Sequence, residues 1–160
     1  MQIKKTYPNA EIKGLRGNVN TRLQKLRDGE YDGIILAHAG LNRMGLMNNE
    51  AYEYHIFSTE EFIPAGGQGI LAVEGRKDDE ISDLARKISD KGTEICYKAE
   101  RRVLELLNAG CNEPYGVYAT IEGEMLQIRL LTELAGNLCV SAISGEIEQA
   151  EELARKLVTG

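Results

Sequence analysis

The sequence predicts an α/β segment followed by a small α+β unit, and three patterns carry this expectation. A continuous apolar run at 33–37 lies between two helical stretches, as in strands that are buried on both faces of a parallel sheet. Three short segments with strict alternation follow one another near the C-terminus. Helical spacing of apolar residues on either side of these segments supplies a covering layer.

The composition is that of an ordinary globular protein. With 160 residues, of which 42% are hydrophobic, the chain can bury a core as one domain or as two small ones. A net charge of −6 argues against a nucleic-acid or anionic-membrane binder, because both need a basic surface. No apolar run spans a bilayer and the N-terminus lacks a signal-peptide core, so we expect a soluble cytoplasmic protein.

The first part of the chain is predicted to alternate strands and helices. Residues 11–15 form a strand, and Asn18 is the N-cap of a helix that Gly29 ends. The strand 33–37 precedes a short helical turn at 40–46. A parallel sheet normally needs more strands than this, so we expect that a preceding part of the protein is missing.

The middle of the chain is predicted to be a junction. Residues 47–63 have no clean period and receive no assignment. The glycine-rich joint 64–69 follows, and then a strand at 70–73. The joint lacks the Lys-Ser/Thr pair of a P-loop and precedes a strand instead of following one, so a flexible hinge is favoured over a phosphate-binding loop.

Two helices are predicted after the junction. Asp78 or Asp79 caps the first, whose apolar face consists of Ile81, Leu84, Ala85 and Ile88. The second begins at Thr93, ends at Gly110, and carries an apolar face of Ile95, Ala99, Val103, Leu106 and Leu107.

Three antiparallel strands and a last helix complete the prediction. The strands cover 115–121, 125–131 and 138–143, and a hairpin at 122–123 joins the first two. Helices on one face of this sheet would bury two apolar stripes, one of Leu126, Ile128 and Leu130 and one of Leu138, Val140 and Ala142. The last helix offers Ile147, Ala150, Leu153, Ala154 and Leu157.

Cys111 is the cysteine that the pattern presents on a turn, between the glycine that ends a helix and Pro114, which prevents the helix from continuing. Cys96 lies on an apolar helix face and Cys139 in a strand, where a free cysteine packs as a small hydrophobe. Three cysteines without a Cys-x-x-Cys pair indicate neither a disulfide framework nor a zinc knuckle.

Three arginines, Arg16, Arg22 and Arg43, lie near predicted strand ends and helix starts. Ligands bind at such places in open α/β sheets, and arginine grips carboxylates bidentately. Solvated surface arginines are nevertheless commoner, and the residues alone favour that alternative. His38 and His55 are isolated in the sequence, so no metal site is indicated.

Ordered motifs along nearly the whole chain resemble porphobilinogen deaminase, also called hydroxymethylbilane synthase. They begin with Leu15-Arg16-Gly17-Asn18-Val19-x-Thr21-Arg22-Leu23-x-Lys25-Leu26 and continue with Gly29-Glu30-Tyr31-Asp32-Gly33-Ile34-Ile35-Leu36-Ala37-x-Ala39-Gly40-Leu41-x-Arg43-x-Gly45-Leu46. Later segments are Pro64-Ala65-x-Gly67-Gln68-Gly69, Ala99-Glu100-Arg101 and Gly110-Cys111-x-x-Pro114-x-Gly116-x-Tyr118-Ala119. The resemblance is therefore extensive and specific.

The resemblance implies a transferase of haem and tetrapyrrole biosynthesis that joins four porphobilinogen molecules into hydroxymethylbilane and releases ammonia. The growing chain is anchored on a dipyrromethane cofactor, held by a thioether to the cysteine that matches Cys111, next to Gly110. A loop thiolate is a suitable nucleophile for such an attachment. Arg16, Arg22 and Arg43 match family arginines that bind the carboxylates of the cofactor and the growing chain.

The family's domain plan implies how this chain is divided. Residues 1–69 would be the C-terminal part of domain 2, a remnant of a periplasmic-binding-protein-like α/β domain. Residues 70–87 would cross back to complete domain 1, and 88–160 would form the α+β domain 3. Strand 70–73 would then lack its sheet, so we expect it to pair within the remnant or with another copy of the chain.

The chain also departs from the family pattern. The region that supplies the catalytic aspartate and further arginines in the family precedes the matched segment, and no aspartate here lies in that motif's context. We therefore expect a form that is inactive alone, with Cys111 unmodified. A non-catalytic module that binds anions or carboxylates through the same arginines is the alternative.

Overall fold

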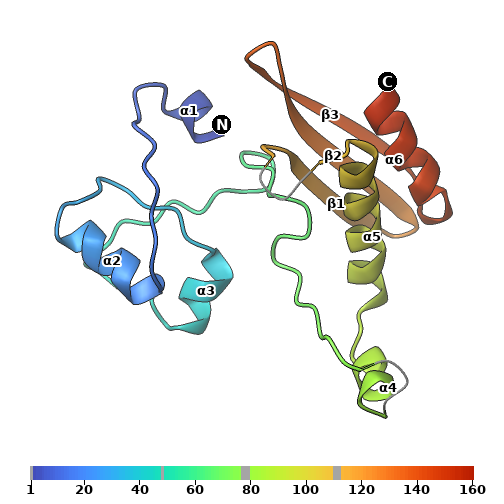
Figure 1. Cartoon of the computed structure of the whole chain (residues 1–160), viewed down its shortest axis with the longest axis horizontal. Coiled ribbons are helices and arrows are strands. Elements are labelled where there is room, and N and C mark those ends of the chain that lie inside the picture. Colours follow the sequence, from blue (N-terminus) through green and yellow to red (C-terminus); the bar gives the residue numbers. More distant parts are fainter. Residues whose placement is uncertain (1, 48, 77–79, 110–112) are drawn as a thin grey trace. The chain divides into compact units, whose positions relative to one another are not determined.

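The computed structural model describes residues 2–47, 49–76, 80–109 and 113–160 (Figure 1). By its internal contacts the chain forms two compact units, residues 2–57 and residues 58–160.

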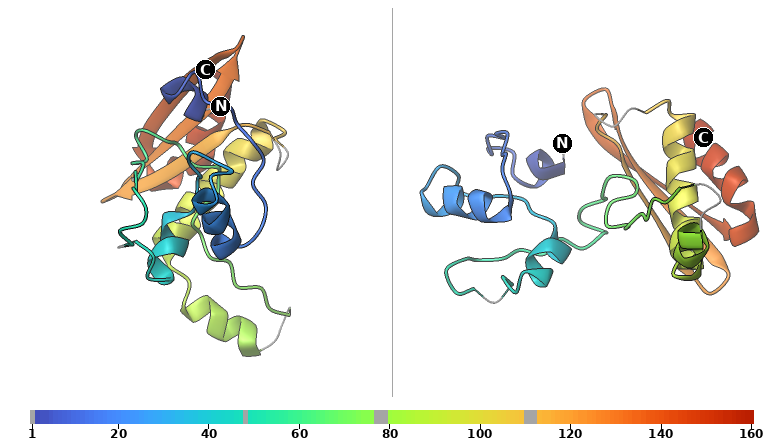
Figure 2. Two further views of the ribbon diagram at one scale, coloured as in Figure 1. Left: turned by 90° about the vertical axis from the view of Figure 1, so that its left-hand side faces the viewer. Right: turned by 60° about the horizontal axis from the view of Figure 1, so that its bottom comes forward.

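The C-terminal unit is built on a three-stranded antiparallel sheet, as predicted. The strands β1 (Gly116–Glu122), β2 (Met125–Leu134) and β3 (Asn137–Glu146) lie in the order β1-β2-β3. A two-residue turn joins β1 to β2, and a second joins β2 to β3. Helices α5 (Lys91–Leu106) and α6 (Ala150–Thr159) cover the same face of the sheet (Figures 1 and 2).

The core of this unit lies between that face and the two helices. The predicted stripe of β2 is buried there, and the predicted apolar face of the last helix contributes Leu153, Ala154 and Leu157. The predicted stripe of β3 is wrong. Register pairs Leu130 with Ser141 and Ile128 with Ile143, so Val140 lies on the opposite face and is 51% exposed. Alternation defines two faces but does not say which one packs.

Helix α5 begins and ends a few residues from where the sequence placed it. Its N-cap is Asp90, whose side chain accepts a hydrogen bond from the backbone N–H of Thr93 at 2.7 Å. At the C-terminus Asn108 has φ +51°, and the N–H of Ala109 donates to the carbonyl of Leu104. This is a Schellman ending with asparagine in the left-handed position. The prediction that Gly110 ends the helix is therefore wrong.

The N-terminal unit contains short helices: α1 (Gln2–Thr6), α2 (Val19–Arg27) and α3 (His38–Arg43). Helix α2 confirms its prediction, because Asn18 accepts a hydrogen bond from the N–H of Thr21 at 2.9 Å and Gly29, with φ +74°, follows the last turn. Helix α3 begins two residues before the predicted turn at 40–46.

The predicted strands at 11–15, 33–37 and 70–73 form no ladder among the described residues. A parallel strand has regular hydrogen bonds only when a neighbouring strand supplies them, and neither unit brings one to these segments. The periplasmic-binding-protein-like sheet is therefore not found in the described part of this chain. The expectation that 70–73 pairs within the remnant is likewise not met in the described part of the structure.

The segment that leads to α4 (Glu80–Lys87) exposes large apolar side chains to solvent. Leu71 is 80% exposed and Val73 is 64% exposed, and after them Leu84 and Ile88 are exposed as well. The predicted capping residues of this helix, Asp78 and Asp79, lie outside the described residues. Apolar side chains at helical and strand spacing thus remain uncovered along this stretch.

Candidate functional site

The face of the sheet opposite α5 and α6 is partly covered by residues 58–64, here called the strap. Arg129 of β2 donates from Nη1 to the carbonyl oxygen of Thr59 at 3.0 Å and lies 3.7 Å from a carboxylate oxygen of Glu60. Ile63 is only 2% exposed and lies against Gly116, and Leu131 on the same face is also buried. The strap therefore belongs to the core of the C-terminal unit.

The glycine-rich joint continues from the strap and packs closely on the same unit. Because Pro64 is counted with the strap, the joint is residues 65–69 from here on. A Cβ on Gly66 would lie 2.8 Å from Leu104, so only glycine allows this approach without a shift. Gly67 has φ +78° and lies against the ring of Tyr97. At these two residues the joint packs on the C-terminal unit, and the flexible hinge stays a prediction.

Glu100 connects the joint to the sheet. One carboxylate oxygen accepts from the N–H of Gly67 at 2.6 Å, and the other accepts from the N–H of Ala119 at 2.9 Å. On the same strand the N–H of Val117 donates to the carbonyl of Pro64 at 2.9 Å. A backbone carbonyl and a carboxylate thus take two N–H groups at the outer edge of β1, where another strand would otherwise pair.

Burial sets the electrostatics of this contact. Glu100 is 4% exposed, and it is the buried charged residue of the described chain. Burial raises the pKa of its carboxyl, while the hydrogen bonds from Gly67 and Ala119 act in the opposite direction. Cys96, one turn earlier on α5, has a pKa raised by burial and by the nearby charge of Glu100. Its thiol is accordingly a poor nucleophile at neutral pH.

Cys111 and Gly110 lie outside the described residues, but both flanks of their loop are described. On one side the Schellman ending of α5 fixes Asn108 and Ala109. On the other side Gly116 is buried, and a Cβ there would lie 2.8 Å from the carbonyl oxygen of Ile63. The loop therefore starts on α5 and ends where the strap presses on β1.

The three arginines lie in the N-terminal unit. Arg22 donates from Nε to the carbonyl of Gly17 at 2.8 Å, which brings its guanidinium to the N-terminal end of α2. Arg43 is in the last turn of α3. Arg16 and Arg43 are exposed, and their side chains make no hydrogen bond or ion pair with the described residues. No contact in the described residues joins the three arginines to one another.

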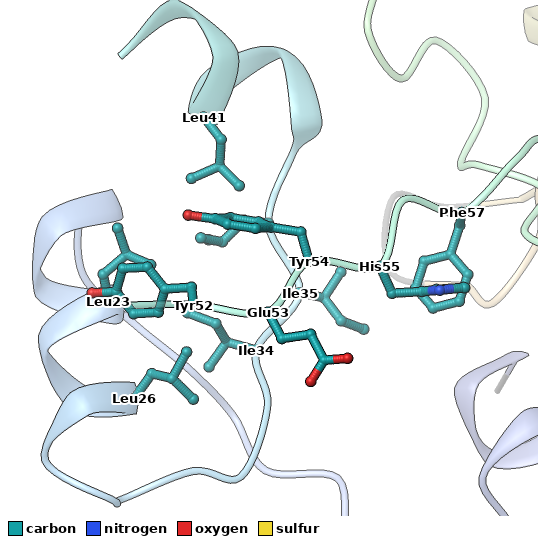
Figure 3. A pocket seen from close by; sticks show the side chains of 11 residues that line it. Leu23, Leu26, Ile34, Ile35, Leu41, Tyr52, Glu53, Tyr54, His55 and Phe57 are labelled. Carbon is teal, nitrogen blue, oxygen red and sulfur yellow. The ribbon is translucent and has the colours of Figure 1, made fainter. Parts of the chain in front are cut away.

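A pocket in the N-terminal unit does not use these arginines. It lies between α2, α3 and the segments 34–36 and 52–57, and its walls are mostly apolar (Figure 3). The hydroxyl of Tyr52 is buried here without a hydrogen-bond partner among the described residues. The pocket volume of about 130 Å³ is below the roughly 300–1,000 Å³ of ordinary ligand sites. It is better explained as space beside two segments that lack neighbouring strands.

The described residues form neither a metal centre nor a membrane-spanning helix. The described part of the chain has no cluster of three or more His, Cys, Asp or Glu side chains that could hold a metal ion. None of its described helices is both long and apolar enough to cross a bilayer.

Glu100, Arg129 and Ile63 were not predicted from the sequence as site residues. A signal for Glu100 was present, because it lies four residues after Cys96 and three before Val103, on the apolar face of its helix. An acidic residue in that position needs buried donors.

Comparisons with known proteins agree with the motifs. Residues 1–83 match the family model described as "Porphobilinogen deaminase, dipyromethane cofactor binding domain", and residues 94–159 match "Porphobilinogen deaminase, C-terminal domain". The porphobilinogen deaminase of Macrococcus caseolyticus is 46% identical over 127 residues, which are 79% of this chain and 41% of that protein.

Two further relatives match almost the whole chain. The porphobilinogen deaminase of Acetivibrio thermocellus is 40% identical over 158 residues, covering 98% of this chain and 53% of the relative. The porphobilinogen deaminase of Coxiella burnetii (strain Dugway 5J108-111) is 40% identical over 161 residues, covering 99% of this chain and 52% of the relative. The chain thus spans about half the length of the curated relatives that it matches.

The raised pKa of Glu100 gives a pH dependence with a definite sign. Between the ordinary glutamate value of 4.5 and the higher folded-state pKa, the folded protein binds more protons at this group than the unfolded protein. The contribution of Glu100 to the free energy of unfolding therefore falls as pH rises through that window. We expect the unfolding free energy of the native chain, minus that of Glu100→Gln, to decrease from about pH 4.5 upward and then level off.

Urea unfolding of both proteins at a series of pH values measures this difference. Asp90 and Glu94 act in the opposite direction, because hydrogen bonds from Thr93 and Lys98 respectively lower their pKa values, but both groups are present in the two proteins and cancel. A difference that stays flat or increases with pH would contradict the assignment.

Proposed function

The chain belongs to the porphobilinogen deaminase family, and on that premise we propose that it serves the synthesis of hydroxymethylbilane from porphobilinogen, a transferase reaction of haem biosynthesis. The observation that carries the proposal is the match of almost the whole chain to family models and relatives, with the cysteine motif between α5 and β1. The two described cysteines, Cys96 and Cys139, are free, which fits a reducing compartment and supports a cytoplasmic location.

Within this proposal Cys111 holds the dipyrromethane cofactor, and Gly110 is its neighbour in the family motif. When bound, the cofactor supplies the pyrrole position on which the product chain is extended. A thioether of this kind forms when a thiolate sulfur bonds to a pyrrole methylene and the amine of that carbon leaves as ammonia. The other two cysteines are half-buried in α5 and β3, and the thiol of Cys96 is kept protonated by its surroundings.

Arg16, Arg22 and Arg43 bind the carboxylates of cofactor and substrate in this proposal. Acetate and propionate groups are planar anions that a guanidinium holds with two parallel hydrogen bonds. The exposed guanidinium groups of Arg16 and Arg43, and the position of Arg22 beside the start of α2, support this role.

The domain plan and the limits of the isolated chain belong to the proposal as well. Residues 1–69 correspond to the C-terminal part of domain 2, 70–87 to the crossing segment and 88–160 to domain 3. The 160-residue chain contains no aspartate in the context of the family's catalytic one, so we infer that it does not turn over porphobilinogen by itself. A non-catalytic carboxylate-binding module is the alternative function.

The state of Cys111 tests this proposal. We expect the purified 160-residue chain to have the intact mass of the unmodified sequence. The reason is that cofactor loading, by analogy with the family, needs the substrate-binding cleft between domains. Titration calorimetry with porphobilinogen, with Cys111→Ser as the matched variant, then distinguishes the two hypotheses, a part of the enzyme and a non-catalytic binding module. Equal binding by both proteins supports the module, and an added dipyrromethane mass would overturn the inference that the isolated chain stays unloaded.

The exposed crossing segment supports a second proposal, that copies of the chain associate through residues 70–73. Leu71 and Val73 are exposed, and the backbone of 71–73 makes no hydrogen bond with the described residues. We expect sedimentation equilibrium to show a concentration-dependent dimer that Val73→Lys weakens. The control is Val140→Lys, an exposed valine on the sheet. A sedimentation mass equal to that of the monomer at all concentrations would contradict the proposal.

A further inference from the structure

Three motifs that are far apart in the sequence meet at one buried carboxylate. The joint supplies Gly67, helix α5 supplies Glu100, and strand β1 supplies Ala119. The family model that matches residues 1–83 includes the joint, and the one that matches residues 94–159 includes the helix and the strand. Glu100 therefore connects the two parts of the chain that the family models treat separately.

The contact is specific in its chemistry. A carboxylate has two acceptor oxygens and no donor, so it can serve two N–H groups at once. In the variant Glu100→Gln the amide could accept only through its single carbonyl oxygen, and its NH₂ group would face the second N–H donor. The 2.6 Å distance from Gly67 is short, as in charge-assisted hydrogen bonds, and the 2.9 Å distance from Ala119 is an ordinary N–H···O distance. A shorter aspartate would not span the same gap.

The contact also lies next to the cysteine loop. Two residues before Ala119, Val117 is bonded to the strap, and Gly116 is pressed against Ile63. The residues of β1 that follow the loop, Gly116 and Val117, thus contact the strap directly. Glu100 is the side chain that fastens the joint there.

We propose that Glu100 is a positioning residue that locks the joint 65–69 onto the edge of β1 and thereby fixes both the exit direction of the crossing segment and the C-terminal flank of the Cys111 loop. The part of the proposal that concerns Cys111 rests on the proposed function. The lock itself rests only on the contacts of Glu100.

The first test uses the native chain labelled for NMR and needs no variant. We expect the amide signals of Gly67 and Ala119 and the side-chain carboxyl carbon of Glu100 to titrate with one common midpoint. Cys96 is the titratable side chain shown to interact with Glu100, and its pKa is raised, so it titrates far above this window. The joint and β1 meet Glu100 with backbone amides. Separate midpoints, or amides that do not respond, would overturn the lock.

The second test measures amide hydrogen exchange in Glu100→Gln, with Glu105→Gln as the control on the exposed side of the same helix. Loss of one hydrogen bond to a charged acceptor should speed exchange roughly tenfold or more at 65–69 and 115–117, and by a clearly smaller factor in β2. The control should change these rates less than about twofold. A uniform increase that includes β2 would mean a merely stabilising role and would overturn the positioning role, as would unchanged rates.

The two tests can fail separately from the proposed function. Cofactor attachment is read from intact mass and does not enter either measurement. A chain in which Cys111 never becomes modified, but in which the NMR and exchange results hold, would keep the lock and remove the proposed role of the thiol.

Discussion

The two hydrogen bonds that Glu100 accepts from Gly67 and Ala119 are the constraint on which the C-terminal unit depends. A three-stranded sheet has an outer edge on β1 whose N–H groups need acceptors. Here the carbonyl of Pro64 and the carboxylate of Glu100 supply them, and no fourth strand of the described residues is used. The cost is the burial of a carboxylate, which the raised pKa of Glu100 records.

This arrangement gives a reason for two glycines of the motifs that identify the family. A Cβ on Gly116 would lie 2.8 Å from the backbone carbonyl oxygen of Ile63, so a side chain there would push the strap away from β1. Gly67 has φ +78°, a conformation that favours glycine. The motifs are thus parts of one packed structure, and the cysteine loop begins and ends beside it. Family membership supports the chemistry proposed for that loop, and the packing holds the described residues on either side of it.

The sequence predicted those elements that depend on local patterns. Helix α2 has its cap and its glycine ending within a few residues, and the hairpins of the sheet have alternation and short turns. The strands at 11–15, 33–37 and 70–73 could not be predicted reliably, because a strand of a parallel sheet exists only with its neighbours. The buried face of β3 depends on register, which alternation alone does not give.

The residues of the candidate site likewise fall into those that the sequence indicated and those that only the folded structure shows. Cys111 and the arginines were found through the family resemblance, since a thiol on a turn and surface arginines are common in any protein. Glu100 lay inside a quoted motif, yet its partners are 33 and 19 residues away, beyond the reach of local patterns. Long-range contacts of this kind are visible only in the folded chain.

The stability of two shortened chains, 58–160 and 70–160, tests most directly the claim that strap and joint are part of the C-terminal unit. We expect 58–160 to unfold cooperatively in urea. We also expect 70–160 to be less stable by several kcal/mol, because Glu100 loses a donor and the buried face around Leu131 becomes exposed. Equal urea midpoints for the two chains would contradict this claim.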